Sequence, residues 1–229
     1  MKNKIAIIAA HPDDEILGCG ATMAKHIQAG DEVSVLIMAE GITSRDQQRN
    51  RNARSEELSE LAETAIAANK ILGVTSVTLK NFPDNRMDSI DRLDIIKTIE
   101  NFIEKQQPDI IYTHYNNDLN IDHRRINEAV VTACRPQPGS TVKSLLFFEV
   151  ASSTEWQIPN TFSPNWFVDV SETLNLKLKA LEAYQSEMRP YPHARSIQAV
   201  EHLARWRGAS VGVEAAEGFV LGRTLINKI

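Results

Sequence analysis

The first two-thirds of the chain alternate between short apolar runs and longer, helix-like segments. The apolar runs are rich in β-branched residues, which is typical of buried parallel strands. They predict strands at residues 4–9, 32–38, 76–79, 110–113 and 145–148. The longer segments predict helices at residues 16–28, 48–72, 88–106 and 123–134.

Such alternation predicts an α/β fold, with a Rossmann-like, doubly wound, mostly parallel sheet and helices on both of its faces. Ligands of these folds bind beyond the carboxyl ends of the strands. The last third is less regular and predicts a polar loop at 151–164, a helix at 171–188, an irregular loop at 188–193, a helix at 196–207 and a final strand at 218–223. We expect one domain over residues 1–229, whose C-terminal third, from about residue 150, completes the substrate pocket.

Composition narrows the classes of function. The chain has 229 residues, 42% of them hydrophobic and 24% charged, with a net charge of −5 and no long basic run, which argues against a nucleic-acid partner. Cys19 and Cys134 form no CxxC pair, which argues against a zinc finger or a redox motif. We expect no signal peptide, because His-Pro-Asp-Asp interrupts the first apolar run early, and no apolar segment is long enough to span a bilayer. These features predict a cytoplasmic enzyme and leave a homo-oligomer open.

A dense polar cluster, His11-Pro12-Asp13-Asp14-Glu15, directly follows the first predicted strand. Burying several like charges unpaired is costly, and a bound cation is the simplest compensation. The dipole at a helix start ordinarily explains one or two acidic residues, but it does not explain this whole cluster. The cluster therefore predicts a metal site.

A second polar cluster, Asp118-Leu119-Asn120-Ile121-Asp122-His123, follows a later apolar run. By itself it has plain explanations, since Asp122 could cap a helix and His123 could lie on the surface. Together with the first cluster it supplies two histidines and a carboxylate, enough for a catalytic zinc that keeps an open coordination position. Spacing alone does not distinguish Asp13 from Asp14 as the carboxylate ligand.

Three further features carry weaker signals. Gly18-Cys19-Gly20 lies inside a helix pattern, which favours close helix packing over a dinucleotide-binding loop. The arginines of segment 45–54 favour a solvated helix face, with Arg54 as the one expected to contact substrate. His114 follows a strand and is expected to line the pocket, without an assigned role.

The chain resembles the PIG-L/LmbE-like family of zinc-dependent N-deacetylases. The resemblance rests on both polar clusters, on Ala39-Glu40-Gly41 after the second strand, and on the Arg-rich helix that ends at Leu72-Gly73. It implies that His11, Asp14 and His123 bind one zinc ion and that Asp13 is the general base. It also implies that the substrate is an N-acylated amino sugar or its conjugate.

One position departs from the family pattern. Many members carry His-Pro-Asp-His in the second motif, whereas this chain has Asn120 at the first of these positions. Asn120 can donate a hydrogen bond to an oxyanion, but it cannot supply the proton that a leaving amine needs. We expect His193, in a loop restrained by two prolines, to supply this proton, with Asp122 as a further candidate.

We therefore predict a zinc-dependent amidohydrolase that removes a small acyl group, such as acetyl, from an N-acylated amino sugar or its conjugate. The expected substrate contacts after the last predicted parallel strand are Glu149, Ser152, Ser153 and Thr154.

Two other classes stay open at this point. A non-haem iron enzyme could use His11, Asp13 and His123 as a two-histidine, one-carboxylate site. A non-catalytic metal- or sugar-binding module could have lost activity through the change at Asn120.

Overall fold

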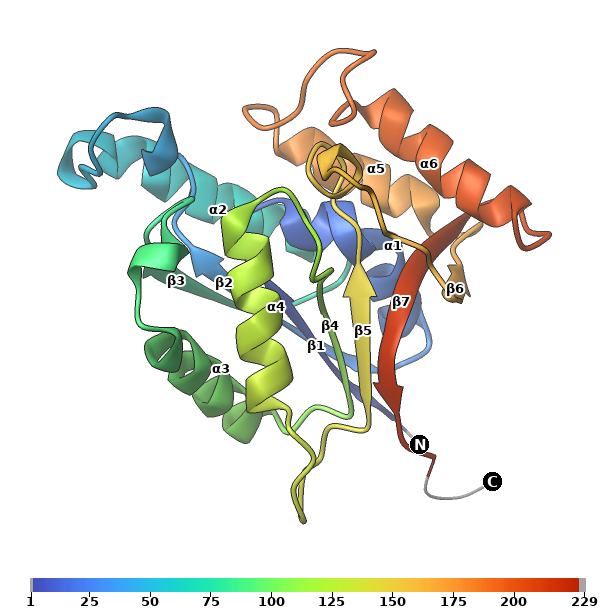
Figure 1. Cartoon of the computed structure of the whole chain (residues 1–229). Coiled ribbons are helices and arrows are strands. Elements are labelled where there is room, and N and C mark those ends of the chain that lie inside the picture. The colour runs from blue at the N-terminus through green and yellow to red at the C-terminus, as the bar shows by residue number, and fades with distance from the viewer. Residues whose placement is uncertain (1, 227–229) are drawn as a thin grey trace.

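The computed structural model describes residues 2–226 and contains, within them, a seven-stranded sheet with the strand order β3-β2-β1-β4-β5-β7-β6 (Figure 1). Neighbouring strands from β3 to β5 are parallel, whereas β7 is antiparallel to both β5 and β6. The strands are β1 (Lys4–Ala9), β2 (Glu32–Ala39), β3 (Ser76–Phe82), β4 (Ile110–His114), β5 (Ser144–Phe148), β6 (Trp166–Asp169) and β7 (Ala216–Thr224).

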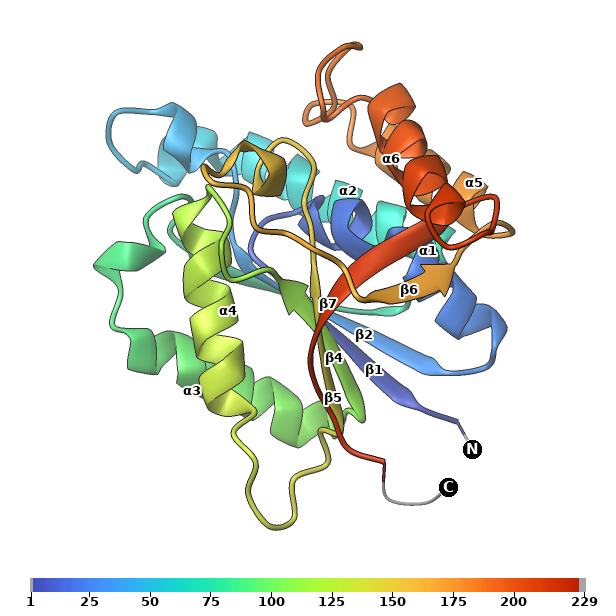
Figure 2. The ribbon, with the colours of Figure 1, turned by 45° about the vertical axis from the view of Figure 1, so that its right-hand side comes forward.

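Helices cover both faces of the sheet (Figure 2). One face carries α1 (Asp14–Gln28), α2 (Ser55–Ile71), α5 (Leu174–Ala183) and α6 (Ile197–Ala209), and the other carries α3 (Arg92–Gln106) and α4 (Ile121–Ala133). The alternation of side chains along β1 explains the two cores. Ile5 and Ile7 pack into the first layer, whereas Ala6 and Ile8 pack into the second.

The topology places a binding crevice between β1 and β4. The chain runs outward from β1 through β2 to β3 and then returns to β4 on the other side of β1. Such a reversal separates the loops that follow the two strands, and ligands of open α/β sheets bind there. The first polar cluster follows β1 and the second follows β4, so both lie at this switch point.

The structure confirms the predicted fold class and corrects several predicted elements. The helix predicted at 48–72 begins only at Ser55, after a short 3₁₀ turn, because Arg49 and Arg51 instead pair with the buried Glu40. The helix predicted at 171–188 is confined to Leu174–Ala183. The edge strand β6 was not predicted, since its four residues carry too short a pattern to stand out.

Helix α1 is interrupted at Cys19, whose φ of −151° and ψ of 25° are not helical. The glycines beside this break pack closely, as expected. An added Cβ at Gly18 would lie 2.3 Å from Phe148 Cδ2, and one at Gly20 would lie 2.9 Å from Ile16 Cγ2. The break separates the first turn of α1, which carries the acidic cluster, from the rest of the helix. Among residues 2–226, no helix combines the length and apolar character that a membrane crossing requires.

Candidate metal centre

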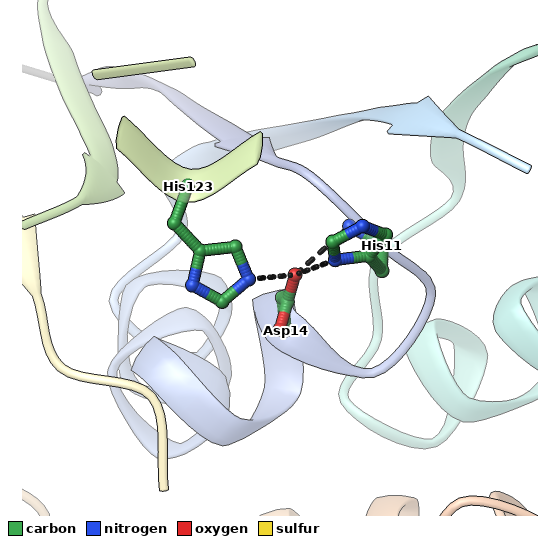
Figure 3. A group of neighbouring side chains, drawn as sticks. All are labelled: His11, Asp14 and His123. Atoms are coloured by element: carbon green, nitrogen blue, oxygen red, sulfur yellow. Dashed lines mark hydrogen bonds and ion pairs between the residues drawn. The ribbon is translucent and has the colours of Figure 1, made fainter. Parts of the chain in front are cut away.

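Asp14 lies between two histidines that come from different elements (Figure 3). Its Oδ2 atom is 3.1 Å from His11 Nδ1 and 3.1 Å from His123 Nε2. His11 follows β1, Asp14 opens α1, and His123 stands in the first turn of α4. One donor atom from each of the three residues lies within 4.8 Å of the other two, so this group can hold a metal ion.

Two buried carboxylates set the orientation of the His11 ring. His11 Nε2 is 3.0 Å from Asp122 Oδ2 and 3.3 Å from Asp84 Oδ1, so we assign a proton to Nε2 and leave Nδ1 to face Asp14. Burial disfavours the charged ring, but the hydrogen bonds to Asp122 and Asp14 outweigh it and hold the pKa of His11 well above its ordinary value. Asp122 is itself fixed by the backbone N–H groups of Asn85 and Met87, at 2.7 and 2.9 Å. With its pKa raised, the metal-free ring also carries a proton on Nδ1, and metal binding at Nδ1 would displace that proton.

His123 is oriented by Asp118, whose Oδ1 lies 3.1 Å from His123 Nδ1. Asp118 also accepts hydrogen bonds from Thr154 Oγ1 at 2.5 Å, from Ser153 Oγ and from the backbone N–H of Asn120. Burial alone would raise the pKa of Asp118, but His123 and the two hydroxyls lower it to about 2. A histidine held this way by a carboxylate presents its other nitrogen to a metal.

The Nε2 atom of His123 is buried and has no hydrogen-bond partner among residues 2–226. Its 3.1 Å contact with Asp14 is short, but the alignment is not that of a hydrogen bond. Buried polar atoms are rarely left in this state. A buried ring nitrogen that faces a carboxylate oxygen at 3.1 Å without a hydrogen bond is the arrangement that a metal ion would complete.

His114 packs against the centre through the ring of His123. Its ring stacks on His123, with centroids 3.9 Å apart and an interplanar angle of 20°, and its Nε2 accepts the backbone N–H of Ala10 at 2.8 Å. Burial and the neighbouring His123 lower the pKa of His114 well below its ordinary value, so the ring is neutral. The nitrogen nearest to Asp14 is therefore already used by the backbone.

The Asp13 carboxylate pairs with Arg195 and lines the same cavity as the two histidines. Its backbone is left-handed, with φ of 103°, and its Oδ2 accepts a hydrogen bond from Arg195 Nη1 at 2.8 Å. Burial raises the pKa of Asp13 well above its ordinary value, and the Arg195 guanidinium opposes this shift. Arg195 was missed in the sequence, because it stands 182 residues away and carries no local motif.

Glu15 stabilises the backbone turn that contains Asp13. Its carboxylate accepts hydrogen bonds from the backbone N–H of Asp13, from Asn69 Nδ2 and from the Tyr184 hydroxyl, at 3.0, 2.9 and 2.8 Å. Burial raises the pKa of Glu15 to about 7. Because a left-handed conformation costs about 1–3 kcal/mol for a residue with a side chain, the surrounding contacts must hold Asp13 in place.

A cavity of about 140 Å³ opens on the centre. Segments from both ends of the chain line it, and the C-terminal third contributes Glu187 and Arg195. Arg45, on the loop after β2, donates from Nη2 to both carboxylate oxygens of Glu187, at 2.8 and 2.9 Å. This ion pair joins the two loops beside the cavity.

Four predicted residues stand around the metal ligands. Asn120 lines the cavity, caps α4 by accepting the N–H of Asp122, and donates to Asn85 Oδ1 at 2.7 Å. Ser153 and Thr154 hold Asp118, as described above, and Ser152 Oγ accepts from Arg195 Nε at 3.0 Å.

The remaining predicted residues are not among those that line the cavity. Arg54 pairs with Asp46 and Glu57, and Glu149 accepts two hydrogen bonds from Arg207, both at 2.8 Å. His193 lies close by, where its Nδ1 accepts the backbone N–H of Arg195 at 3.0 Å. Their substrate or catalytic roles stay predictions.

Comparison with known proteins decides the class of enzyme. Residues 6–134, more than half of the chain, match the model of the PIG-L family, described as GlcNAc-PI de-N-acetylase. The chain belongs to the PIG-L family. As a member it is a deacetylase, an enzyme that hydrolyses an amide, and the alternative of a non-catalytic module is not supported.

Individual relatives agree with this assignment. The chain is 32% identical over 188 residues to the uncharacterized deacetylase YaiS of Escherichia coli K12, covering 80% of this chain and 90% of YaiS. It is 26% identical over 195 residues to the diacetylchitobiose deacetylase of Thermococcus kodakarensis, covering 80% of this chain and 70% of that protein.

The fold extends beyond deacetylases. The crystal structure of GalB, the 4-carboxy-2-hydroxymuconate hydratase of Pseudomonas putida KT2440, is similar with a TM-score of 0.77 and 21% identity, covering 100% of this chain and 99% of GalB. This likeness shows the fold alone, since one fold hosts several chemistries. The substrate of this PIG-L deacetylase must therefore be argued from its site.

Proposed function

We propose that this PIG-L protein is a zinc-dependent amidohydrolase that removes an acetyl or similar small acyl group from an N-acylated amino sugar or its conjugate. The observation that carries the proposal is the position of Asp14 Oδ2, 3.1 Å from a ring nitrogen of each of two histidines, with the adjacent Asp13 carboxylate bonded to Arg195. Two histidines and one carboxylate with room for a further ligand are the donors of many hydrolytic zinc sites.

His11, Asp14 and His123 would hold the zinc ion, and the unpaired Nε2 of His123 supports this assignment. When bound, zinc supplies a nucleophilic water near neutral pH and polarises the acyl carbonyl. An iron triad that includes Asp13 fits less well, because the Asp13 carboxylate is bonded to Arg195 and Asp14 faces both rings.

Asp13 is the proposed general base. It would take a proton from the water that attacks the acyl carbon, as the water oxygen forms a bond to that carbon. Arg195 holds the Asp13 carboxylate in one orientation and favours its charged, proton-accepting form. Positioning of this kind is what a base in a buried site requires.

The leaving nitrogen needs a proton as its bond to the acyl carbon breaks, which yields the free carboxylate and the amine. We propose His193 as the donor. Its Nδ1 accepts the N–H of Arg195, so Nε2 is the nitrogen that carries the transferable proton. Asn120, which lines the cavity, would donate a hydrogen bond to the oxyanion.

The substrate class is proposed from the relatives together with the polar cavity. The names of the family and of the Thermococcus relative describe deacetylation of N-acetylglucosamine conjugates or diacetylchitobiose. Most of the residues that line the cavity carry polar or charged side chains, which suits a hydroxyl-rich ligand. We propose that the C-terminal third completes this pocket through Glu187 and Arg195.

The test is mass spectrometry of products after zinc-loaded protein is incubated with a panel of N-acyl amino sugars, free, nucleotide-linked and lipid-linked. We expect loss of the acyl mass from at least one sugar and release of the matching carboxylic acid. A panel that stays intact while metal analysis shows a full zinc site would overturn the proposal.

A further inference from the structure

Trp156 is a half-exposed aromatic residue whose ring contacts the proposed proton donor His193, and the mechanism above does not use it. It ends the short 3₁₀ turn η4 (Thr154–Trp156), and 48% of its surface is exposed. Tryptophan is enriched among the residues that contribute most to binding at contact surfaces.

Two short chains of contacts tie Trp156 to the centre. Thr154, two residues earlier, donates to Asp118, which holds the ring of His123. The Trp156 ring also lies edge-on to His193, with centroids 5.7 Å apart and an interplanar angle of 79°. His193 in turn accepts from the backbone of Arg195, whose guanidinium contacts the proposed base. The indole is therefore held against His193, one contact away from the arginine that pairs with the proposed base.

The cavity at the metal centre is too small for a whole glycoconjugate. Its volume is about 140 Å³, whereas pockets that enclose complete small ligands occupy about 300–1,000 Å³. The acyl group and part of its own sugar ring fill such a space. Any further sugar must therefore lie outside the cavity, against the loops that surround it.

An exposed indole suits a pyranose ring. One face of a pyranose presents mainly C–H groups, which pack on an aromatic face, while the hydroxyls at the ring edge stay in water. A tryptophan supplies a broad, rigid apolar surface with a single polar N–H, so it can bind such a ligand at small cost in conformational entropy.

We propose that Trp156 is the platform for a second sugar ring, linked to the N-acyl sugar whose amide lies at the metal centre. The inference rests on the proposed function and adds to it that Trp156 is the residue that favours a substrate with a second sugar ring over the free monosaccharide.

The experiment compares N,N′-diacetylchitobiose with N-acetylglucosamine as substrates of the zinc-loaded protein. In Trp156→Ala, the ratio of kcat/KM for the disaccharide to kcat/KM for the monosaccharide should fall about 5- to 10-fold. This ratio cancels any disturbance of His193, because both substrates use the same catalytic groups. Trp156→Phe should recover part of the ratio.

Trp206→Ala is the matched control, since Trp206 lies on α6 and is 68% exposed, whereas the tryptophan ring that packs on His193 is that of Trp156. For Trp206→Ala, the ratio of kcat/KM for the disaccharide to kcat/KM for the monosaccharide should equal that of the wild type. Calorimetric titration of Asp13→Asn with diacetylchitobiose, with and without Trp156→Ala, measures the same contact without turnover. Loss of disaccharide affinity in the Trp156→Ala background is the expected result.

The outcomes separate the two proposals. An unchanged ratio together with unchanged disaccharide affinity overturns the platform and leaves the deacetylase activity standing. A wild-type protein that hydrolyses neither sugar overturns the proposed sugar substrate, and the titration alone then decides the platform. If Asp13→Asn binds diacetylchitobiose equally well with and without Trp156→Ala, the proposed platform is overturned.

Discussion

Lys177 and Glu217 form a buried ion pair, with 2.6 Å between Nζ and Oε1, inside the break in helix α1. Lys177 also donates to the carbonyl of Leu17 at 2.7 Å, and Glu217 accepts the backbone N–H groups of Ala21 and Thr22 at 3.2 and 2.7 Å. In a regular helix the Leu17 carbonyl would accept the N–H of Ala21. The pair therefore satisfies the backbone groups that the break sets free, and it holds the turn that carries Asp14.

Lys177→Met should destabilise the protein by about 3–5 kcal/mol, because it leaves the buried Glu217 carboxylate without its partner. Chemical denaturation measures this loss. The double variant Lys177→Met, Glu217→Gln should lose less, since no unpaired charge remains. Arg205→Ala removes an exposed ion pair with Glu201 and should cost under about 1 kcal/mol. Equal losses for Lys177→Met and Arg205→Ala would contradict this account.

His11→Ala and His123→Ala should each empty the zinc site, because each removes one of the three donors. Asp118→Asn should keep the donors but weaken zinc about 10- to 100-fold, since His123 loses the carboxylate that orients it. Elemental analysis and competition with a chelating dye measure both effects. Purified wild-type protein that takes up no metal even after zinc reconstitution would contradict the assignment of a zinc site here.

Asp13→Asn should retain zinc and lose about 10²- to 10⁴-fold in turnover, because it removes a base and no metal ligand. Asp14→Ala should instead weaken zinc binding. Each variant is measured for both zinc content and kcat. If Asp13→Asn releases zinc while Asp14→Ala retains it, the two roles are reversed.

His193→Ala should leave zinc content unchanged, reduce turnover strongly and alter the alkaline limb of the pH–rate profile, since the proposed proton donor is lost. His202→Ala is the control, because His202 lies on α6 and contacts Tyr191 instead of Arg195. A profile and turnover like those of the wild type would remove His193 from the mechanism and leave Asp122, His114 or water as donor.

Asp31 should make stability depend on acid pH. Burial opposes its ionisation, but hydrogen bonds from His26 and Asn3 outweigh burial and lower the pKa of Asp31. A folded pKa below the unfolded value of about 3.9 means that this stabilisation is present above pH 3.9 and is lost as the pH falls through the folded pKa. The stability difference between wild type and Asp31→Asn should therefore shrink below about pH 3.9. Denaturation curves at several pH values measure it, and a constant difference would contradict the assignment.

The sequence by itself determined the fold class and the location of the centre. Apolar runs alternating with helical segments can be satisfied by few architectures other than a doubly wound sheet. Because the carboxyl ends of its parallel strands meet at one edge, His11 after β1 and His123 after β4 had to approach each other. Local pattern and topology were therefore sufficient to bring the two clusters together.

Only the tertiary structure decided which way the adjacent carboxylates point. The left-handed backbone of Asp13, secured by the buried Glu15, turns Asp14 towards both histidines and Asp13 towards Arg195. Arg195 reaches this place from the C-terminal third through packing that no local pattern encodes. For the same reason the arginine-rich segment after β2 forms ion pairs with Glu40 where a helix was predicted. Long-range contacts of this kind outweigh helix propensity, which amounts to under about 1 kcal/mol per residue.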